Sequence, residues 1–454
     1  MHAAWIAIAL WLGAAAPVMA ADTVTWNRQS GRVDADIAAW PLPRVLQVIR
    51  SRTGWQIYVE PDTEHTVTAR FEGLKPADAL RRLLGDVNFA LLPQTDGPPK
   101  LFVYRHSVDA ATQLVRTSEE GRSKPIENEL LVILKPGIGG LPKHLEGRVV
   151  ARLDAIGAYR LRFADGAAAR KARAELEKDG DVASMETNLE IAPPAILEPL
   201  SMSSPPPFGL QPDVSPSADR VLVGLIDTAV QGDATFLKNF LQPGVALLGD
   251  YQPPADQITH GTAMAETILD GIARALQERG DGSGKVPVSI LPVDVYGGAE
   301  TTNTFDVARG LYEAITRHAN IVNMSLAGDH QSPLLERIIG IATDHGVIVL
   351  AAAGNTPGTT PTYPAAELAV IAVTAADAQG NVAPWANHGA FVDAIAPGMN
   401  VVYLGDGAWL GSGTSFSTSW VTGWAAGFMA SAGQSRSATR QQTLMRWGLD
   451  TGRR

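Results

Sequence analysis

Val221–Asp227, with the sequence Val-Leu-Val-Gly-Leu-Ile-Asp, is the stretch that decides the fold of this chain. Near-continuous apolar runs of this kind are typical of parallel strands that are buried on both faces of a sheet. Four later segments have the same character, and three segments between them have the apolar spacing of helices. The strands are expected at 288–295, 321–324, 347–353 and 370–373, and the helices at 261–278, 304–318 and 333–345. The sequence therefore predicts an α/β fold, a parallel sheet covered by helices on both faces.

Four polar residues in short glycine-containing motifs follow or precede these elements. Asp227 ends the first strand, His260 opens a His-Gly-Thr motif, and Ser415 ends a Gly-Thr-Ser motif. Each motif alone is more often a cap, a structural histidine or a loop. Together they supply an acid, a base and a hydroxyl, which is what nucleophilic catalysis by serine requires. Asn355, at the end of Ala-Ala-Ala-Gly-Asn, adds a side-chain amide that can donate to a developing oxyanion.

In this order the motifs resemble those of the subtilisin-like serine peptidases, the subtilases, over roughly residues 205–445. The resemblance implies a subtilisin-like fold with Asp227 as orienting acid, His260 as general base, Ser415 as nucleophile and Asn355 as oxyanion donor. It also implies an extended polypeptide as substrate, because Asn-Met-Ser-Leu at 323–326 is similar to the substrate-binding strand of the family. The substrate-binding residues expected on this basis are Ser325, Leu326, Ala327, Ala352 and Gly354.

The chain departs from the pattern of the family at several positions outside Asp227, His260 and Ser415. Ala229 and Ala263 replace a usual glycine and a second histidine. Ser419 and Trp420 stand where the family has Pro-His after the nucleophile, so the start of that helix is not fixed by the pattern. Ala327 stands in place of a glycine, and its methyl group is expected to narrow the pocket for the side chain that precedes the scissile bond.

Two alternatives remain open at this point. One is a catalytically silent envelope interaction protein that keeps a peptidase-like scaffold for binding. The other keeps the same three residues but acts as an esterase or a ligase. A reactive serine separates the first alternative from an enzyme, and a comparison of peptide with ester substrates separates the second.

Composition excludes several other classes of protein. The chain has 454 residues, a formal net charge of −10 and no cysteine. No basic cluster with interleaved aromatic residues is present, so nucleic acid is not an expected partner. Without cysteine there is no disulfide framework. The chemistry needs no cofactor, no metal ligands are assigned, and structural calcium is left open because no dense acidic loop is found.

Residues 1–20 have the pattern of a secretory signal peptide, with an apolar core and small residues before Ala21. The stretch breaks at Pro17 and turns polar at Asp22, which favours cleavage over anchoring. No later segment is long and apolar enough to span a bilayer. We therefore expect an exported protein, periplasmic or extracellular, with no membrane span in its mature form.

Two small α+β domains are expected before the peptidase domain at 213–445. The pattern of 24–106 resembles the short N-terminal domain of secretins and TonB-dependent receptors, which implies docking to an envelope partner; any other small α+β module fits the same pattern. Residues 127–193 look like a subtilase propeptide, which implies a role in folding and in blocking the active site; the alternative is an interdomain spacer. A proline-rich linker at 194–212 follows, and maturation is expected to cut within 193–212.

Overall fold

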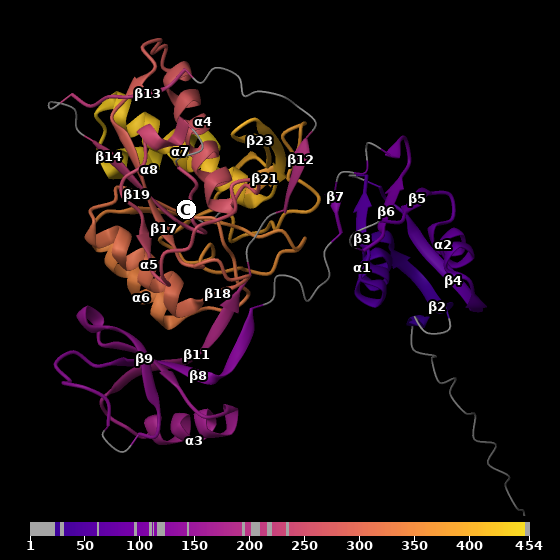
Figure 1. Cartoon of the computed structure of the whole chain (residues 1–454), viewed down its shortest axis with the longest axis horizontal. Helices are drawn as coiled ribbons and strands as arrows, with labels where there is room; N and C mark the ends of the chain where they lie inside the picture. The colour runs from indigo at the N-terminus through magenta and orange to yellow at the C-terminus, as the bar shows by residue number, and fades with distance from the viewer. Residues whose placement is uncertain are drawn as a thin grey trace, which may run out of the picture. The chain divides into compact units, whose positions relative to one another are not determined.

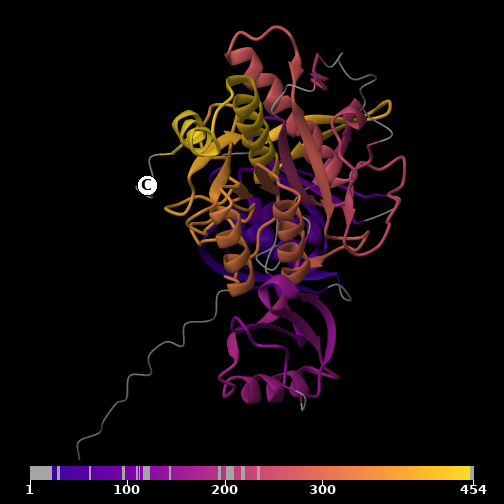
Figure 2. The same cartoon turned by 90° about the vertical axis from the view of Figure 1, so that its left-hand side faces the viewer.

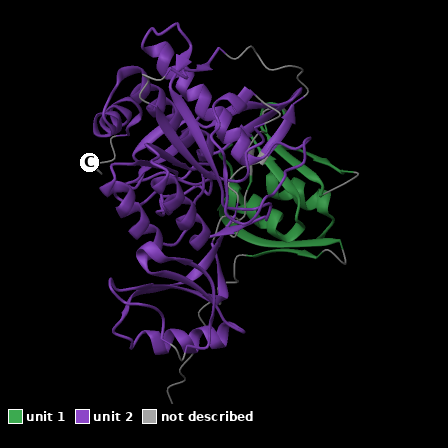
Figure 3. Ribbon diagram, turned by 60° about the vertical axis from the view of Figure 1, so that its left-hand side comes forward, with its two compact units in different colours: residues 1–117 green, residues 118–454 purple. Residues whose placement is uncertain are grey.

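The computed structural model forms two compact units, residues 1–117 and 118–454 (Figure 3). The described residues are 23–27, 31–60, 63–94, 98–108, 111, 113–115, 123–142, 145–192, 196–200, 209–215, 220–232 and 236–449. The expected signal peptide, and most of the expected linker, lie outside these ranges. None of the helices in the described ranges has the length and apolar character needed to cross a membrane.

The first unit is built from two small sheets and two helices. A three-stranded antiparallel sheet has the order β1-β2-β4, and a four-stranded sheet has the order β5-β6-β3-β7. Helix α1 (Leu42–Thr53) ends at Gly54, whose φ of 73° suits a glycine C-cap, and it buries Leu42, Val45, Leu46 and Ile49 along one face. The other elements are β1 (Thr23–Asn27), β2 (Arg32–Pro41), β3 (Gln56–Val59), β4 (Thr66–Leu74), α2 (Pro76–Leu84), β5 (Asn88–Leu92), β6 (Lys100–Tyr104) and β7 (Gln113–Leu114).

The second unit opens with a five-stranded antiparallel sheet that includes a strand from the following domain. Its order is β18-β11-β8-β10-β9, and β18 (Thr302–Asn303) lies far along the chain from the others. Alternate residues of β8 point to opposite faces: Leu130 and Val132 pack with helix α3, whereas Leu131 and Ile133 join the large core of the unit. The remaining elements are β8 (Lys124–Leu134), β9 (Arg148–Leu153), β10 (Ala158–Arg162), α3 (Gly166–Leu176) and β11 (Val182–Ile191).

A seven-stranded sheet forms the centre of the second unit. Its order is β15-β17-β14-β19-β20-β21-β22, and every pair in it is parallel. One core cluster packs beneath α4 and α7, and another packs beneath α5 and α6, so both faces are covered (Figures 1 and 2). The strands are β14 (Val221–Asp227), β15 (Val245–Ala246), β17 (Val288–Asp294), β19 (Ile321–Met324), β20 (Ile348–Ala352), β21 (Ile371–Ala376) and β22 (Ala394–Pro397). The helices are α4 (His260–Glu278), α5 (Thr304–Thr316), α6 (Pro333–Asp344), α7 (Thr414–Ala432) and α8 (Arg436–Trp447).

Helices α4 and α7 cross at glycines, which lets their backbones approach closely. A Cβ on Gly423 would lie 1.9 Å from the carbonyl oxygen of Ile268, and one on Gly271 would lie 2.3 Å from that of Trp420. Beside these helices, β12 (Ile196–Leu200), β24 (Gly407–Ser412) and β23 (Met399–Leu404) form a small antiparallel sheet. A further two-stranded parallel pair joins β13 (Gln211–Pro212) to β16 (Lys285–Val286).

The five strands and three helices predicted for the peptidase-like part are all present in the structure. The strand predicted at 321–324 has the same bounds as β19, and the helix predicted at 261–278 is α4 with one residue added. The hairpin of β23 and β24 was not predicted, because glycines such as Gly407 and Gly411 obscure its strand pattern. The helix whose start the sequence left unsettled begins at Thr414.

Candidate active site

The predicted site residues gather at the carboxyl ends of the central strands. Asp227 is the last residue of β14, and Asn355 lies just beyond the end of β20. The chain leaves β14 to form β17 on one side of it and then β19 on the other. The site therefore lies where the strand order reverses, which is where open α/β sheets form their ligand crevices.

Asp227 and His260 form a buried hydrogen-bonded pair. Oδ1 of Asp227 lies 2.7 Å from Nδ1 of His260, and the two residues are 2% and 7% exposed. A carboxylate in this position holds Nδ1 as the protonated ring nitrogen and leaves Nε2 as the acceptor. Nε2 has no hydrogen-bond partner and is shielded from solvent. The pair thus presents one basic nitrogen that is not engaged elsewhere.

Local sequence holds this histidine at the first position of α4. The hydroxyl of Thr259 accepts a hydrogen bond from the N–H of Thr262 and caps the helix. Gly261 follows the histidine because a Cβ there would lie 2.2 Å from the carbonyl oxygen of Thr228. Its own N–H donates to the Thr228 hydroxyl at 2.8 Å. The His-Gly-Thr motif therefore locks the start of α4 against the end of β14.

Ser415 is the second residue of α7 and is fully buried. Its Oγ donates to the carbonyl oxygen of Ser325 at 3.3 Å. No hydrogen bond joins Ser415 to His260. Hydrogen bonds between catalytic groups are often long or misaligned in ligand-free enzymes and tighten only when substrate binds, so this geometry does not exclude a catalytic pair.

The side chain of Asn355 is oriented by the residue before the serine. Its Oδ1 accepts from the N–H of Thr414 at 2.8 Å and from the Thr414 hydroxyl at 3.0 Å. This network directs the amide oxygen toward Thr414 and the NH₂ group away from it. A Cβ on Gly413 would lie 3.1 Å from Nδ2 of Asn355, so the glycine of Gly-Thr-Ser makes room for this amide.

A buried polar network supports the turn that carries Ser415. The Asn323 amide donates to the Ser325 hydroxyl at 2.8 Å and accepts from the Thr422 hydroxyl at 2.9 Å. The Ser325 hydroxyl lies 3.3 Å from that of Ser419, which in turn contacts Sδ of Met264 at 3.1 Å. Ser419, a departure from the family pattern, thus touches both the substrate-binding segment and α4.

The expected substrate-binding residues lie on two segments that border Ser415. Ser325, Leu326 and Ala327 directly follow β19, whose neighbour β20 ends at Ala352. Gly354 has a φ of 102°, which glycine adopts readily, and its N–H donates to the Thr414 hydroxyl at 3.1 Å. The structure therefore brings both segments to the side of the site that holds the serine.

Sequence reasoning missed two titratable residues beside Asp227. Asp294 ends β17 in register with Asp227, and burial raises its pKa. Tyr296 is 2% exposed, and burial, followed by the charges of Asp227 and Asp294, raises its pKa well above the usual value. The sequence did contain a signal for Asp294, because the predicted strand that begins at Val288 also has an aspartate near its carboxyl end.

Two further acids occupy α4 behind His260. Glu266 is 3% exposed, and burial raises its pKa to about 8; Asp270, one turn later, has its pKa raised to about 6 for the same reason. Oε2 of Glu266 accepts from the N–H of Tyr403, but Oε1 has no partner. The Asn400 amide donates to Asp270.

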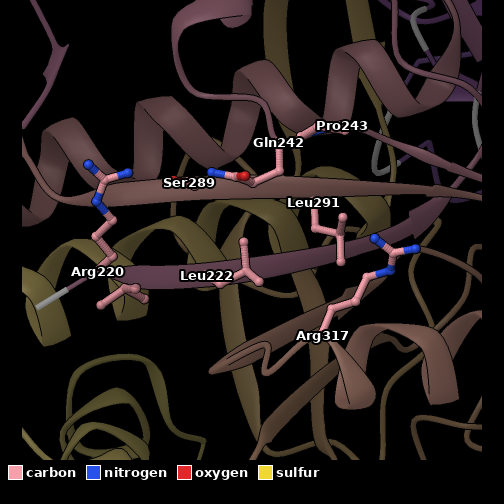
Figure 4. Close-up of a pocket in the computed structure, with 8 residues that line it drawn as sticks. Arg220, Leu222, Gln242, Pro243, Ser289, Leu291 and Arg317 are labelled. Carbon is pink, nitrogen blue, oxygen red and sulfur yellow. The ribbon is translucent and has the colours of Figure 1, made fainter. Parts of the chain in front are cut away.

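One cavity of about 290 Å³ lies at the other end of β14, away from Asp227 (Figure 4). It is lined by the start of β14 and by residues of β17, with Arg220 and Arg317 at its edges. It contains none of the predicted site residues and is not part of the candidate active site. Within the described ranges, no group of three or more histidine, cysteine, aspartate and glutamate residues is arranged to hold a metal ion.

Two parts of the chain are similar to known protein families. Residues 218–448 match the Subtilase family, and residues 111–188 match the fervidolysin N-terminal prodomain. The chain is 32% identical over 192 residues to the thermophilic serine proteinase of Bacillus sp. strain AK1, and this match covers 42% of this chain and 47% of that protein. It is 29% identical over 234 residues to the M-protease of Shouchella clausii strain KSM-K16, which covers 50% and 57%. The chain thus spans about half the length of these curated relatives.

A solved structure supports the fold. The crystal structure of fervidolysin from Fervidobacterium pennivorans, a keratinolytic enzyme related to subtilisin, superposes with a TM-score of 0.52 at 20% sequence identity. The match covers 70% of this chain and 56% of that one. The predicted subtilisin-like α/β architecture is therefore confirmed, and the propeptide-like character predicted for the segment before it is supported by the prodomain match.

Proposed function

The chain belongs to the subtilase family, and on that premise we propose that residues 213–445 form a serine endopeptidase with Asp227, His260 and Ser415 as its catalytic residues. The observation that carries the proposal is the 2.7 Å contact between Asp227 and Nδ1 of His260, which leaves the buried Nε2 without a partner. A basic nitrogen in that state is suited to take the proton of a serine hydroxyl.

The reaction begins when Ser415 turns from the Ser325 carbonyl toward Nε2 of His260 and attacks a peptide carbonyl. His260 takes the hydroxyl proton, and Asp227 stabilises the imidazolium that forms. The Asn355 amide and the Ser415 backbone N–H donate to the oxyanion. His260 then protonates the leaving amine, and water hydrolyses the acyl-enzyme by the same steps. Ser325, Leu326, Ala327, Ala352 and Gly354 bind the substrate backbone on the acyl side.

A fluorophosphonate probe on the mature protein tests this proposal. Labelling at Ser415, lost in Ser415→Ala, is the expected result because the probe reacts with an activated hydroxyl. Asn355→Ala is expected to keep the label but to cut peptide turnover by about 100- to 1000-fold. An unlabelled, folded protein would favour the silent scaffold. Turnover of ester substrates without turnover of peptide substrates would favour an esterase. The intact set of acid, base and hydroxyl is what argues against the silent scaffold.

The propeptide-like segment 127–193 is proposed to assist folding and to block the active site until it is cut off within 193–212. Its docking supports this role, because it engages the N-termini of the two helices on one face of the sheet. Arg160 pairs with Asp306 in the first turn of α5 at 3.0 Å. Glu186 accepts from the Ser332 hydroxyl at 2.8 Å and from the N–H of Leu334 at 3.0 Å, at the start of α6. N-terminal sequencing of the active protein tests the proposal, and an intact junction in a fully active enzyme would defeat it.

Export to the periplasm or the extracellular space is proposed from the signal-like residues 1–20. Fractionation of cells that express the full chain, with and without these residues, tests it. Docking of the 24–106 domain to an envelope protein is a further part of the proposal, supported by its compact fold of two sheets and two helices. A pull-down from envelope extracts with the separate unit as bait tests that part. The control bait is the Val45→Asp variant, in which the core is disrupted. Thermal melts with and without chelator test for structural calcium.

A further inference from the structure

The cavity of about 290 Å³ lies at the end of β14 opposite Asp227, and none of the proposed catalytic residues lines it (Figure 4). Its floor contains Leu222 of β14 together with Ser289 and Leu291 of β17. Leu222 pairs with Ser289 in the parallel register, and Leu291 is two residues further along β17. Their side chains therefore leave the same face of the sheet. Leu291 belongs to the core cluster of α5 and α6, so this is the face that those helices cover.

Helix α5 ends before it covers this part of the sheet. A Cβ on Gly224 would lie 2.9 Å from Cβ of Ala314, which is near the end of the helix. Leu222, two residues closer to the start of β14, is only half-buried. Arg317 is the C-cap of α5, and the chain then turns into β19. The floor of the cavity is thus the stretch of sheet that the helix leaves open.

Three polar side chains stand around this floor. Gln242 lies beside β17, because its N–H donates to the carbonyl oxygen of Ile290 at 2.8 Å. Gln242 and Arg317 lie on opposite sides of the two strands, and Arg220 precedes the first residue of β14 (Figure 4). The cavity therefore combines an apolar floor with polar groups on several sides.

Most of these polar groups are hydrogen-bond donors that the fold leaves available. Among the described residues, the Arg220 guanidinium donates only to the carbonyl oxygen of Val214, at 3.4 Å. Nε of Arg317 lies 3.6 Å from the Glu313 carboxylate, a half-exposed pair that is too long for a hydrogen bond. A guanidinium carries five N–H donors. Most donors of both arginines thus remain for water or for a ligand.

The charge around the cavity is opposite to that of the chain. No acidic residue is among the described residues that line it, whereas the whole chain has a formal net charge of −10. Arginine binds carboxylates through two parallel hydrogen bonds, which makes a carboxylate the matching ligand group. An inorganic anion would leave the floor of Leu222 and Leu291 in contact with water. The cavity therefore suits a carboxylate that is attached to an apolar group.

We propose that this cavity binds the free C-terminal end of a peptide, with its carboxylate on the arginines and an aliphatic last side chain on the leucine floor. The volume is close to the lower limit of small-molecule sites, about 300 Å³, which suits one or two amino-acid residues. This inference rests on the proposed peptidase function, because peptide hydrolysis releases new C-terminal carboxylates. The cavity and Asp227 lie at opposite ends of β14, so a bound peptide end leaves the proposed catalytic residues accessible.

The first test compares acetyl-Ala-Leu, which has a free carboxylate, with the same dipeptide as its C-terminal amide. Binding is measured by ligand-observed NMR titration on the full-length Ser415→Ala chain, which lacks the proposed nucleophile. The acid is expected to bind with a Kd of about 0.1–1 mM, which is usual for a ligand of this size. The amide is expected to bind about tenfold more weakly, because it cannot form charge-assisted hydrogen bonds with arginine. Equal binding of both probes, or binding of neither, would overturn the inference.

The second test locates the binding site with Arg317→Gln and Arg220→Gln. Each substitution is expected to weaken binding of the acid about tenfold and to leave binding of the amide unchanged. Arg274→Gln is the matched control, because Arg274 also pairs with a glutamate four residues later, Glu278, but lies on α4 away from the cavity. Equal urea midpoints show that the variants are folded. A similar loss in the control, or no loss in either cavity variant, would place the binding elsewhere and refute the proposal.

The third test changes only the ligand, so it does not depend on the folding of a variant. Acetyl-Ala-Gly lacks the aliphatic side chain and is expected to bind about tenfold more weakly than acetyl-Ala-Leu. Inorganic phosphate at the same concentration is expected not to displace acetyl-Ala-Leu. Equal binding of the two dipeptides, or displacement by phosphate, would show a general anion site and would contradict a site for peptide ends.

Failure of this inference and failure of the proposed function give different results. Binding needs no turnover, so a Ser415→Ala chain that does not bind the acid overturns the cavity proposal alone. Fluorophosphonate labelling of Ser415 in the wild type reports the proposed peptidase independently.

Discussion

The two faces of the central sheet are covered by helix pairs that pack in different ways. On one face, α4 and α7 carry His260 and Ser415 and meet through glycine, with a Cβ at Gly423 placed 1.9 Å from a backbone oxygen. On the other face, α5 and α6 present their N-termini to the propeptide-like sheet through ion pairs and caps. The proposed catalytic groups thus lie on helices held in close backbone contact, whereas the helices of the opposite face meet the propeptide-like sheet through polar pairs beside a shared apolar core.

Two buried glutamates, one at each of these contacts, differ in the direction of their pKa shifts. Glu129, at the propeptide-like contact, is 1% exposed; burial raises its pKa, but hydrogen bonds from Arg160, Asn188 and Arg162 outweigh burial and lower the pKa overall. Glu266, on α4, is 3% exposed and has no cation beside it, so burial raises its pKa to about 8. At neutral pH the Glu129 carboxylate at the propeptide-like contact therefore stays ionised, whereas Glu266 on α4 is protonated.

Glu129→Ala is expected to give the largest effect, because it leaves the Arg160 guanidinium, 13% exposed, with only Asp306. Loss of one partner of a buried ion pair costs about 3–5 kcal/mol. Urea unfolding of the full-length Ser415→Ala chain measures it, followed by hydrogen exchange in β8. The control is Glu127→Ala on the same strand, whose 3.7 Å pair with Arg170 is exposed and contributes little. Equal effects of the two substitutions would show that the charged contact does not hold the propeptide-like unit.

The sequence predicted what is periodic or local in this comparison. The apolar runs predicted the buried strands, and the short glycine-containing motifs singled out Asp227, His260, Ser415 and Asn355 as candidate site residues. The sequence could not reveal contacts between residues that lie far apart in the chain and belong to no common motif. Glu129 and Asp306 lie far apart in the chain, Ser419 was seen only as a departure from Pro, and β12 reads as a proline-containing linker until β24 is beside it.

The free energy of unfolding of the wild type is expected to fall as pH rises, and Glu266→Gln is expected to abolish this fall. The folded pKa, about 8, exceeds the ordinary value of 4.5, so the folded state binds the extra proton. Stability therefore falls between about pH 4.5 and 8 and stays low above that range. At pH 9 the variant is expected to be more stable by roughly 2–4 kcal/mol, less than the full pKa difference implies because the site relaxes on ionisation.

Thermal or urea unfolding from pH 4 to 9 measures this slope. Asp270→Asn is the matched variant on the same helix, with a smaller effect confined to the range from about pH 3.8 to 6. Below about pH 3 neither substitution is expected to matter, because both carboxyl groups are then protonated in the folded and in the unfolded state. A wild-type stability that does not change between pH 5 and 8 would contradict the idea that Glu266 is protonated in the fold.

Gly423→Ala tests the close contact of α4 and α7 directly. The added methyl would meet the carbonyl of Ile268, which is backbone and cannot rotate away. Overpacking of this kind costs roughly 1–3 kcal/mol, and we expect the upper end of that range. Because both helices carry proposed catalytic residues, turnover is expected to fall together with stability. Urea unfolding and peptide turnover, measured on the same preparation, check the two effects, and a drop in neither would show that the helices can part.

Gly340→Ala on α6 is the smallest effect and has the opposite sign. Gly340 lies inside the helix, is exposed, and has no atom within 4 Å of where a Cβ would lie. Alanine there lowers the entropy of the unfolded chain without a clash, so we expect a gain of about 0.5–1 kcal/mol in the free energy of unfolding. Activity is expected to stay unchanged, because α6 carries none of the proposed catalytic residues. A lower free energy of unfolding in Gly423→Ala and a higher one in Gly340→Ala would locate the rigid contact on the face covered by α4 and α7. A loss of stability in both variants would mean that the helices pack equally tightly on the two faces.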